Sequence, residues 1–506
     1  MKSERTWKQI LFSDVGILIL LALVKLILHM LTNGQYGFHR DELATLDDAR
    51  HLAWGFVAYP PLTPFLARIE LTLFGTSLEG FRFFSALAQS VVIVVAGLIA
   101  RELGGRRLAF FVAALAVAIT PVSMAMSFMY QYVSFDYLWW VLLAYFVIRL
   151  QNSKDARWWL AIGTVIGLGM MTKYTIAYYV VGIVVGVLLT QNRKYLTSRW
   201  LWVGVALSLL IFLPNLIWQV QHNFISLQFL GSIHARDVRI GRADGFITDQ
   251  FIMTANPFTI PLWIAGLFFY FFSKAGKPYR LIGWMAVVPF VLFLVSQGRG
   301  YYTGPIYPML LCGGAVLFER WVASMSPARA KLAQGLNWGL LAIGAVIVVL
   351  LGPYAPINSG WWNIISGINQ DLREEIGWTE LVQTVNGIYQ NIPADEKAQT
   401  GIIAGNYGEA GAINLYGPAY GLPNAISGIN SFWYRGYGDP PPQKLIVVGF
   451  DSNTASRYFE QCTFAAEVTN AYGVKNEETR DHPFIFVCGN LRQSWSEFWK
   501  NFQYFG

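Results

Sequence analysis

Carboxylates gather in one short stretch that follows the first long apolar run of the sequence. Four of them fall within eight residues: Asp41, Glu42, Asp47 and Asp48. A carboxylate that approaches a hydroxyl can remove its proton, so such groups are natural candidates for general base catalysis. We expect Asp47 and Asp48 to be ordinary solvated acids or residues of the first turn of a helix. Asp41 and Glu42 lie between an aromatic-rich turn and the apolar run, which favours a functional role for them.

Two further positions combine a charge with a place close to the membrane boundary. Asp136 has aromatic residues on both sides, although an aspartate there could also cap a helix. Lys173 follows an apolar run of only 15 residues, 158–172, which covers about 22 Å of a hydrocarbon core about 30 Å thick. A cation at that depth usually lines a cavity or meets an anion. The alternative for Lys173 is a long side chain that reaches back to the interface.

A glycine- and proline-rich turn at 297–308 carries the last candidate group. Arg299, Tyr301 and Tyr302 could clamp an anionic head group, or the tyrosines could only anchor the chain at the interface. Arginines, histidines and aspartates alternate in the segment 221–256, which we expect to be a mixed solvated loop or a mobile gate. Acids and cations at lipid depth together suggest a reaction that involves a lipid phosphate.

The composition places these groups in an integral membrane protein. Of the 506 residues, 55% are hydrophobic and 13% are charged, and the mean hydropathy is +0.41, whereas soluble domains carry about 25% charged residues. The net charge of +7 is spread over short loops, which argues against a nucleic-acid-binding surface.

Eleven apolar runs are long enough to predict membrane spans. They lie near residues 10–31, 81–100, 108–128, 134–150, 158–172, 174–190, 200–220, 257–273, 281–297, 305–323 and 336–355. The basic loops follow the even-numbered runs, and Lys2, Arg5 and Lys8 precede the first. The positive-inside rule therefore predicts a cytoplasmic N-terminus and an extracytoplasmic region after residue 356.

The region 357–506 is more polar and alternates between strand and helix patterns. Strands are predicted at the start of 400–408 and at 444–450, 464–470 and 483–489, with helices at 409–421 and 454–462. We therefore predict a polytopic all-α membrane domain, 1–356, with outer loops at 32–80 and 221–256, followed by an extracytoplasmic α/β domain, 357–506. Cys462 and Cys488 could form a disulfide or remain buried thiols, and Cys312 is expected to be a packing residue.

Five motifs in order resemble the GT-C superfamily of membrane glycosyltransferases, and more narrowly bacterial members of glycosyltransferase family 39. This group resembles dolichyl-phosphate-mannose-protein mannosyltransferases and is related to the lipid A aminoarabinose transferase. The motifs are "RDE" at 40–42, "YPPL" at 59–62, "SFDYLWW" at 134–140, "GLGMMTKYT" at 167–175 and "GRGYYTGPIYP" at 298–308. Tyr59 departs from the lysine that the aminoarabinose enzymes usually have before Pro-Pro. The resemblance implies a GT-C fold of about eleven transmembrane helices in a bacterial inner membrane.

By this resemblance, the protein moves a sugar from a polyprenyl-phosphate donor to a hydroxyl of a lipid, glycan or protein, with inversion. Asp41 would be the base, Glu42 its partner and Asp136 the group that orients the sugar. Lys173, Arg299, Tyr301 and Tyr302 would bind the donor phosphate. The acceptor and the first loop would be positioned by His39, Arg40, Tyr59, Pro60 and Pro61. No nucleotide cofactor is needed because the lipid-linked sugar is already activated, and a divalent metal beside the phosphate is possible.

Two other classes of function compete with this interpretation. A secondary transporter of an anionic substrate would also place charges in a membrane domain, although such proteins often contain internal repeats, and we find none. A non-catalytic assembly factor would use the region 357–506 to bind a partner. Both alternatives predict that no donor is consumed.

Overall fold

The computed structural model describes residues 13–506, which form two compact units. The helical unit consists of residues 13–33, 82–221 and 234–352. The sheet unit consists of residues 34–81, 222–233 and 353–506. The segment 34–81 therefore groups with the C-terminal region, although ten apolar helices lie between the two in the sequence.

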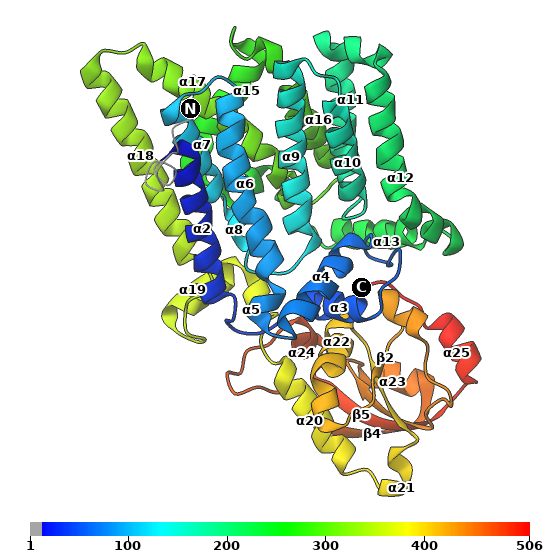
Figure 1. Cartoon of the computed structure of the whole chain (residues 1–506). Helices are drawn as coiled ribbons and strands as arrows, with labels where there is room; N and C mark the ends of the chain where they lie inside the picture. The colour runs from blue at the N-terminus through cyan, green and yellow to red at the C-terminus, as the bar shows by residue number, and fades with distance from the viewer. Residues whose placement is uncertain (1–12) are drawn as a thin grey trace, which may run out of the picture. The chain divides into compact units, whose positions relative to one another are not determined.

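Long apolar helices build the helical unit, and neighbours such as α2, α6, α9, α10 and α12 run alongside one another in Figure 1. Their bounds are α2 Asp14–Thr32, α6 Phe83–Glu102, α7 Arg107–Ala118, α9 Tyr132–Ser153, α10 Trp158–Met170, α11 Ile176–Leu189, α12 Arg199–Gln221, α15 Ile260–Phe272, α16 Arg280–Val295, α17 Tyr307–Ala323 and α18 Pro327–Leu350. Each predicted apolar run falls on one of these helices, except that residues 10–12 of the first lie outside the described part of the chain.

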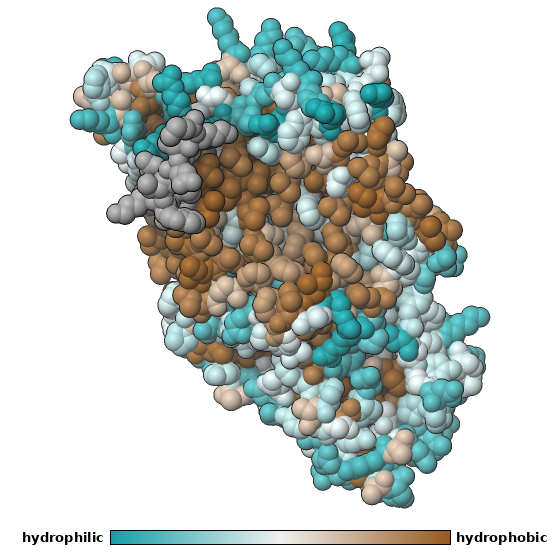
Figure 2. Space-filling view, viewed as in Figure 1, coloured by the Kyte–Doolittle hydropathy of each residue, from teal (hydrophilic) through white to brown (hydrophobic). Residues whose placement is uncertain are grey.

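Not all of these helices are long enough to cross a membrane alone. Seven helices in residues 13–506 are long and apolar enough, or up to nine spans if each of two bent pairs is one span. The helices 107–118 and 158–170 are apolar but shorter. Figure 2 shows hydrophobic side chains in a broad band over the helical unit, with hydrophilic side chains at its upper end. Such a band is the surface that hydrocarbon requires.

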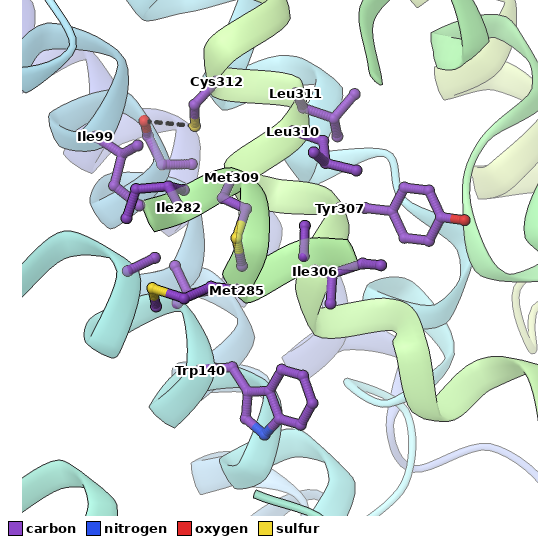
Figure 3. Packing of buried hydrophobic residues seen from close by; sticks show 14 of the residues in the cluster. Ile99, Trp140, Ile282, Met285, Ile306, Tyr307, Met309, Leu310, Leu311 and Cys312 are labelled. Carbon is purple, nitrogen blue, oxygen red and sulfur yellow. Dashed lines mark hydrogen bonds between the residues drawn. The ribbon is translucent and has the colours of Figure 1, made fainter. Parts of the chain in front are cut away.

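The interior of the helical unit is packed with large apolar side chains, some of which Figure 3 shows. Trp140 on α9 is fully buried and stacks on Tyr179 of α11, with 4.2 Å between the ring centroids. Cys312 is also fully buried, and its Sγ donates a hydrogen bond to the carbonyl oxygen of Ala96 at 3.1 Å. Cys312 is therefore a packing residue, as predicted.

Ten helices and five strands form most of the sheet unit. The helices are α3 Arg40–Arg50, α4 Leu62–Phe74, α5 Leu78–Phe81, α19 Gly360–Ile368, α20 Trp378–Gln390, α21 Ala394–Lys397, α22 Tyr407–Tyr416, α23 Ser452–Tyr458, α24 Glu477–Asp481 and α25 Trp495–Asn501. The strands are β1 Thr400–Ala404, β2 Ala425–Ile426, β3 Lys444–Val448, β4 Phe459–Glu467 and β5 Phe484–Leu491.

The strands form one mixed sheet in the order β2-β1-β3-β5-β4. β1 is parallel to β2 and β3, whereas β5 is antiparallel to β3 and β4. Apolar side chains of β1, β3 and β5 pack with α23 and α25 in one core cluster. The sheet and its helices confirm the predicted α/β character of this region.

The sequence patterns misplaced some boundaries in the sheet unit. The predicted helix 454–462 ends at Tyr458, because β4 begins at Phe459 and pairs with β5. Strand β2 and helix α20 were not predicted. Cys462 on β4 and Cys488 on β5 are directly opposite each other in the antiparallel register, and they form a disulfide.

The two segments that were expected to be outer loops are largely helical. Residues 34–81 contain α3, α4 and α5, and α13 Ile225–Arg239, α14 Phe246–Asp249 and the π-helical turn Gln250–Thr254 occupy most of 221–256. Most of 221–256 is therefore helical rather than an irregular loop, although many of its side chains are exposed. Its mixed charges are compatible with a helix because side chains three or four residues apart share a helical face.

Candidate functional site

The N-terminus of α3 holds the first group of predicted site residues. His39 is the N-cap, and its Nδ1 accepts a hydrogen bond from the backbone N–H of Asp41 at 3.1 Å. Glu42 completes a capping box, because its carboxylate accepts a hydrogen bond from the backbone N–H of His39 at 2.8 Å. The Glu42 side chain is fully buried. Glu42 therefore fixes where α3 begins and so positions its neighbour Asp41.

The carboxylate of Asp41 is partly exposed, with 38% of its side-chain surface accessible. The phenolic hydroxyl of Tyr407, at the start of α22, donates a hydrogen bond to Asp41 Oδ1 at 3.0 Å. Asp41 Oδ2 lies 4.0 Å from His39 Nδ1. Asp41 thus combines access to solvent with an orientation set by its neighbours, which suits a group that exchanges a proton with a bound molecule.

Arg40 points to acidic residues of the C-terminal region. Its Nη1 lies 2.6 Å from Glu477 Oε2 and 3.4 Å from Glu478 Oε1, both on α24. Burial, and repulsion between neighbouring acids, raise the pKa of Glu374 to about 8, while Arg40 opposes this change. Glu374 in turn accepts a hydrogen bond from the backbone N–H of Glu477 at 3.0 Å. Arg40 therefore supplies positive charge to a cluster of acids that includes the buried Glu478.

Asp47 and Asp48 are buried, which contradicts the expectation that they are solvated. Nη2 of Arg435 lies 2.9 Å from Asp47 Oδ2 and 2.5 Å from Asp48 Oδ1. The amide of Asn414 donates to Asp47 Oδ1 at 2.7 Å. Tyr59 is also buried, and its hydroxyl donates to Asp48 Oδ2 at 2.7 Å. The i, i+1 acids face inward because the C-terminal region supplies a cation and an amide opposite them, which a sequence pattern does not reveal.

These contacts have opposite effects on the two carboxyl groups. Burial raises the pKa of Asp48 to about 6, although Arg435 and the Tyr59 hydroxyl act against this rise. Burial also tends to raise the pKa of Asp47, but its hydrogen bonds and Arg435 outweigh burial and lower it. Tyr59, predicted to position the acceptor, has its hydroxyl bonded to Asp48 inside the sheet unit. In the structure, the hydroxyl of Tyr59 therefore stabilises the buried carboxylate of Asp48.

Pro60 and Pro61 lie between Tyr59 and α4. Both are buried, and Pro61 is the residue that precedes the first turn of α4. Proline suits this position because the first turn of a helix leaves backbone N–H groups without an intrahelical acceptor. Several apolar side chains of α4, among them Phe65 and Leu73, are exposed at 51% and 62%, so α4 is an amphipathic helix with an exposed apolar face.

In the helical unit, Asp136 lies inside α9 and is only 5% exposed. It is not the helix cap that the alternative interpretation proposed, because the N-cap of α9 is Gln131. The indole N–H of Trp140 donates to Asp136 Oδ1 at 3.1 Å, and the hydroxyl of Thr175 donates to Oδ2 at 3.2 Å. These two donors hold the carboxylate in one orientation.

Lys173 lies in the short connection between α10 and α11, where aromatic rings enclose its ammonium group. Nζ lies 3.9 Å from the ring centroid of Tyr302 and 4.2 Å from that of Tyr132. No carboxylate in residues 13–506 forms an ion pair with this ammonium. Contacts with ring faces stabilise a cation by roughly 0.5–2 kcal/mol and leave its N–H donors available to an anion.

Arg299 lies at the start of a short helical segment, η5 Gly300–Ile306, that also carries Tyr301 and Tyr302. The rings of these two tyrosines contact each other edge to face, with 4.7 Å between their centroids. Arg299 Nε lies 2.6 Å from Asp237 Oδ2, and this ion pair was not predicted. The guanidinium of Arg299 is therefore already held by a carboxylate.

The structure brings Lys173, Tyr302, Tyr301 and Arg299 together within the helical unit. His39, Arg40, Asp41 and Glu42 lie together in the sheet unit. Sequence reasoning missed Tyr132, Asp237, Tyr407 and Arg435 as partners of these residues. Tyr407 lies within "NYGEAGAINLYG", where "NYGE" has the pattern of a capping box, so the start of a helix there was visible in the sequence. The sequence does not decide whether a metal ion is bound. Residues 13–506 contain no group of three or more His, Cys, Asp or Glu side chains that could hold a metal ion.

Comparisons with known proteins agree with the motifs. Residues 58–218 match the family model described as dolichyl-phosphate-mannose-protein mannosyltransferase. Lipid A galacturonosyltransferase RgtD from Rhizobium johnstonii is 23% identical over 348 residues, which cover 68% of this chain and 71% of that protein. ArnT from Cupriavidus metallidurans in the apo state has a similar fold, with a TM-score of 0.62, 14% identity, and coverage of 94% of this chain and 98% of that one.

A second structure of the same ArnT, bound to undecaprenyl phosphate, matches with a TM-score of 0.59, 14% identity and the same coverage. The family match and the curated relative indicate a membrane glycosyltransferase, and the chain shares its fold with ArnT, a structure of the GT-C type. Within that class, the matched region 58–218 relates it to the dolichyl-phosphate-mannose-protein mannosyltransferases.

Proposed function

We propose that the protein transfers a sugar from a polyprenyl-phosphate donor to a hydroxyl acceptor, with inversion, on the extracytoplasmic side of a bacterial inner membrane. The acceptor belongs to a lipid, a glycan or a protein. In this proposal the N-terminus is cytoplasmic and the region 357–506 is extracytoplasmic. The ArnT structure bound to undecaprenyl phosphate and the mannosyltransferase family match support a lipid-phosphate donor.

One observation carries this proposal: the ammonium of Lys173 lies between the rings of Tyr132 and Tyr302, and no carboxylate in the described chain pairs with it. A cation at membrane depth is costly unless an anion or a cavity accompanies it. The phosphate of a polyprenyl lipid is an anion that reaches this depth, because its hydrocarbon chain keeps it in the bilayer. Arg299 and Asp136 both interact electrostatically with Lys173, so a second cation and an acid lie in the same region.

The reaction would then proceed as a single displacement. The acceptor oxygen attacks the anomeric carbon of the sugar while its proton moves to the carboxylate of Asp41. The bond from the anomeric carbon to the phosphate oxygen breaks, and the polyprenyl phosphate leaves with the electron pair. Lys173 and Arg299 stabilise the negative charge that develops on this phosphate. Asp136 orients the sugar, and Glu42 positions Asp41 through the cap of α3.

Donor turnover by purified full-length protein tests this proposal. The protein is placed in proteoliposomes with labelled polyprenyl phosphates that carry mannose, galacturonate or aminoarabinose, and a bacterial membrane extract supplies the acceptors. Asp41→Asn is measured beside the wild type, because asparagine preserves the shape of the side chain but cannot accept the proton. Loss of roughly 100- to 10,000-fold in donor consumption is expected for a missing general base.

A matched control is available on the same helix. Arg50→Gln changes a charged residue at the opposite end of α3, whose Nη1 bonds to the backbone oxygen of Asn414, and should leave turnover within a few-fold of the wild type. Equal activity of Asp41→Asn and wild type would refute Asp41 as the base. Uptake of an anionic solute without any donor consumption would instead favour the secondary transporter.

A further inference from the structure

The sheet unit contains a contact that the mechanism above does not use: helix α22 packs directly against helix α3. Gly408 and Gly411 lie three residues apart on α22, and each meets α3 without room for a side chain. A Cβ on Gly411 would lie 2.8 Å from the backbone of Leu43, and one on Gly408 would lie 2.8 Å from Cβ of Arg40. These two glycines allow the backbones of the two helices to approach closely, one turn apart.

This close approach places Tyr407 beside Asp41. Asn406 caps α22, and its backbone N–H donates to Glu409 at 3.0 Å, so the first turn of α22 is fixed by a capping box. From this turn the hydroxyl of Tyr407 reaches Asp41 Oδ1 at 3.0 Å. Burial, and the negative charge of Asp41, hold the pKa of Tyr407 well above its usual value. The tyrosine therefore keeps its proton and is a hydrogen-bond donor at neutral pH.

The C-terminal region also holds the side chain of Arg40, the residue before Asp41. Its guanidinium lies 5.9 Å from the centroid of the Tyr407 ring and pairs with Glu477 and Glu478 of α24. The side chain of Glu478 is only 3% exposed. The two residues at the start of α3, Arg40 and Asp41, thus have their side chains bound by partners that follow them in the sequence by more than 360 positions.

We infer that Tyr407 is a positioning residue for the proton transfer: its hydrogen bond orients the Asp41 carboxylate and favours the ionised form that accepts the proton. This inference rests on the proposed function, in which Asp41 is the base. A hydrogen bond donated to a carboxylate stabilises its charged form over its neutral form. The C-terminal region would therefore contribute directly to the reaction by controlling a base that lies at residue 41.

The pH dependence of donor turnover distinguishes this role from simple packing. Asp41 accepts a proton only when it is ionised, so activity falls on the acid side of the profile. Tyr407→Phe removes one oxygen atom and keeps the ring against Arg40 and α3. Without the donated hydrogen bond, the acid limb of kcat/KM should move to higher pH by about one unit, because a hydrogen bond to a charged group has about that strength.

The other ionisable groups near Asp41 are unchanged by this substitution. Three of them interact with Asp41 itself: His39, Arg40 and Tyr59. The others are one step further away, since Glu477 and Glu478 pair with Arg40 and Glu374 and Glu409 interact with Glu478. A matched control is Tyr472→Phe, since Tyr472 is 49% exposed in the same unit. This control should leave the acid limb where it is in the wild type.

A second substitution at the same position predicts the opposite displacement. Site-specific incorporation of 3-fluorotyrosine at position 407 retains the hydroxyl but makes it a stronger donor, so the acid limb should move to lower pH. An unchanged acid limb in both 407 variants would overturn the inference. The test also separates the two proposals: if Asp41→Asn is as active as the wild type, the proposed base is wrong, whereas an inactive Asp41→Asn with an unmoved limb in the 407 variants refutes only the role of Tyr407.

Discussion

Arg435 holds two buried carboxylates in the sheet unit, and its removal should destabilise that unit in a pH-dependent way. The side chains of Asp47 and Asp48 are 1% and 7% exposed, and that of Arg435 is 18% exposed. Arg435→Met keeps an apolar side chain at this position but removes the guanidinium, whose carbon lies 4.2 Å from the ring centroid of Phe432. The variant lacks the positive charge that Asp47 and Asp48 share in the wild type.

The magnitude follows from the loss of one partner of a buried ion pair, which costs about 3–5 kcal/mol. Protonation limits this cost for Asp48, whose pKa is already raised to about 6, so we expect about 3 kcal/mol at pH 7.5. At pH 5.5 most of the Asp48 population carries a proton in both proteins, and only the contact with Asp47 is lost. The difference in the free energy of unfolding between variant and wild type should then be about half of its value at pH 7.5.

The direction of this dependence comes from proton binding by the native state. Because the native pKa of Asp48 lies above its value in the unfolded chain, the native state binds more protons between about pH 4 and pH 6. The contribution of Asp48 to stability is therefore present at low pH and is lost as the pH rises through about 6. Without Arg435 the native pKa rises further, so this loss extends to higher pH and is larger.

Thermal unfolding of the full-length protein in detergent, followed at pH 5.5 and 7.5, measures this effect. A loss of 3 kcal/mol corresponds to a decrease in Tm of roughly 6–12 °C for a unit of about 200 residues. Arg457→Met is the matched control, because Arg457 is exposed on α23 of the same unit. If Arg435→Met lowers Tm equally at both pH values, or by less than about 2 °C at pH 7.5, the positive charge shared by Asp47 and Asp48 is not what stabilises the unit.

Two other features of the structure lead to direct tests. Lys173→Met should lower kcat for donor turnover by roughly 100- to 1,000-fold, as for loss of one donor to a developing oxyanion. The control is Lys194→Met, at an exposed lysine that also lies over a tyrosine ring, and it should have little effect. Similar losses of kcat in both variants would contradict the role of Lys173. Cys462 and Cys488 should resist alkylation in unfolded, non-reduced protein and become reactive after reduction, since they form a disulfide; labelling of both before reduction, counted by mass spectrometry with Cys312 as the internal free thiol, would refute it.

The membrane helices could be predicted from the sequence because they depend on local composition. Hydrocarbon imposes long apolar runs regardless of tertiary contacts, and each predicted run falls on a helix. The strands β1, β3 and β5 are continuous apolar segments, which buried strands require. Boundaries were less predictable: 459–462 has a helical pattern, yet these residues pair with β5 in a sheet.

The burial of charged residues depended on partners that are distant in the sequence. Asp47 and Asp48 follow one another in a polar helix, and nothing near them predicts that Arg435 and Asn414 lie opposite. The same is true of Arg299, whose partner Asp237 lies in a segment that was expected to be a loop. A buried charge requires a compensating group, and long-range folding decides which group it is.

The sequence alone determined that this chain is a polytopic membrane protein with an α/β region, and it identified Asp41, Asp136 and Lys173 as candidate site residues. These properties follow from hydropathy, charge and short motifs, which act over a few turns of a helix. Only the tertiary structure decided that Arg435 bonds to Asp48 and that Tyr407 bonds to Asp41. Hydrogen bonds of this kind form over about 3 Å in space between residues that can be hundreds of positions apart, so no local pattern encodes them.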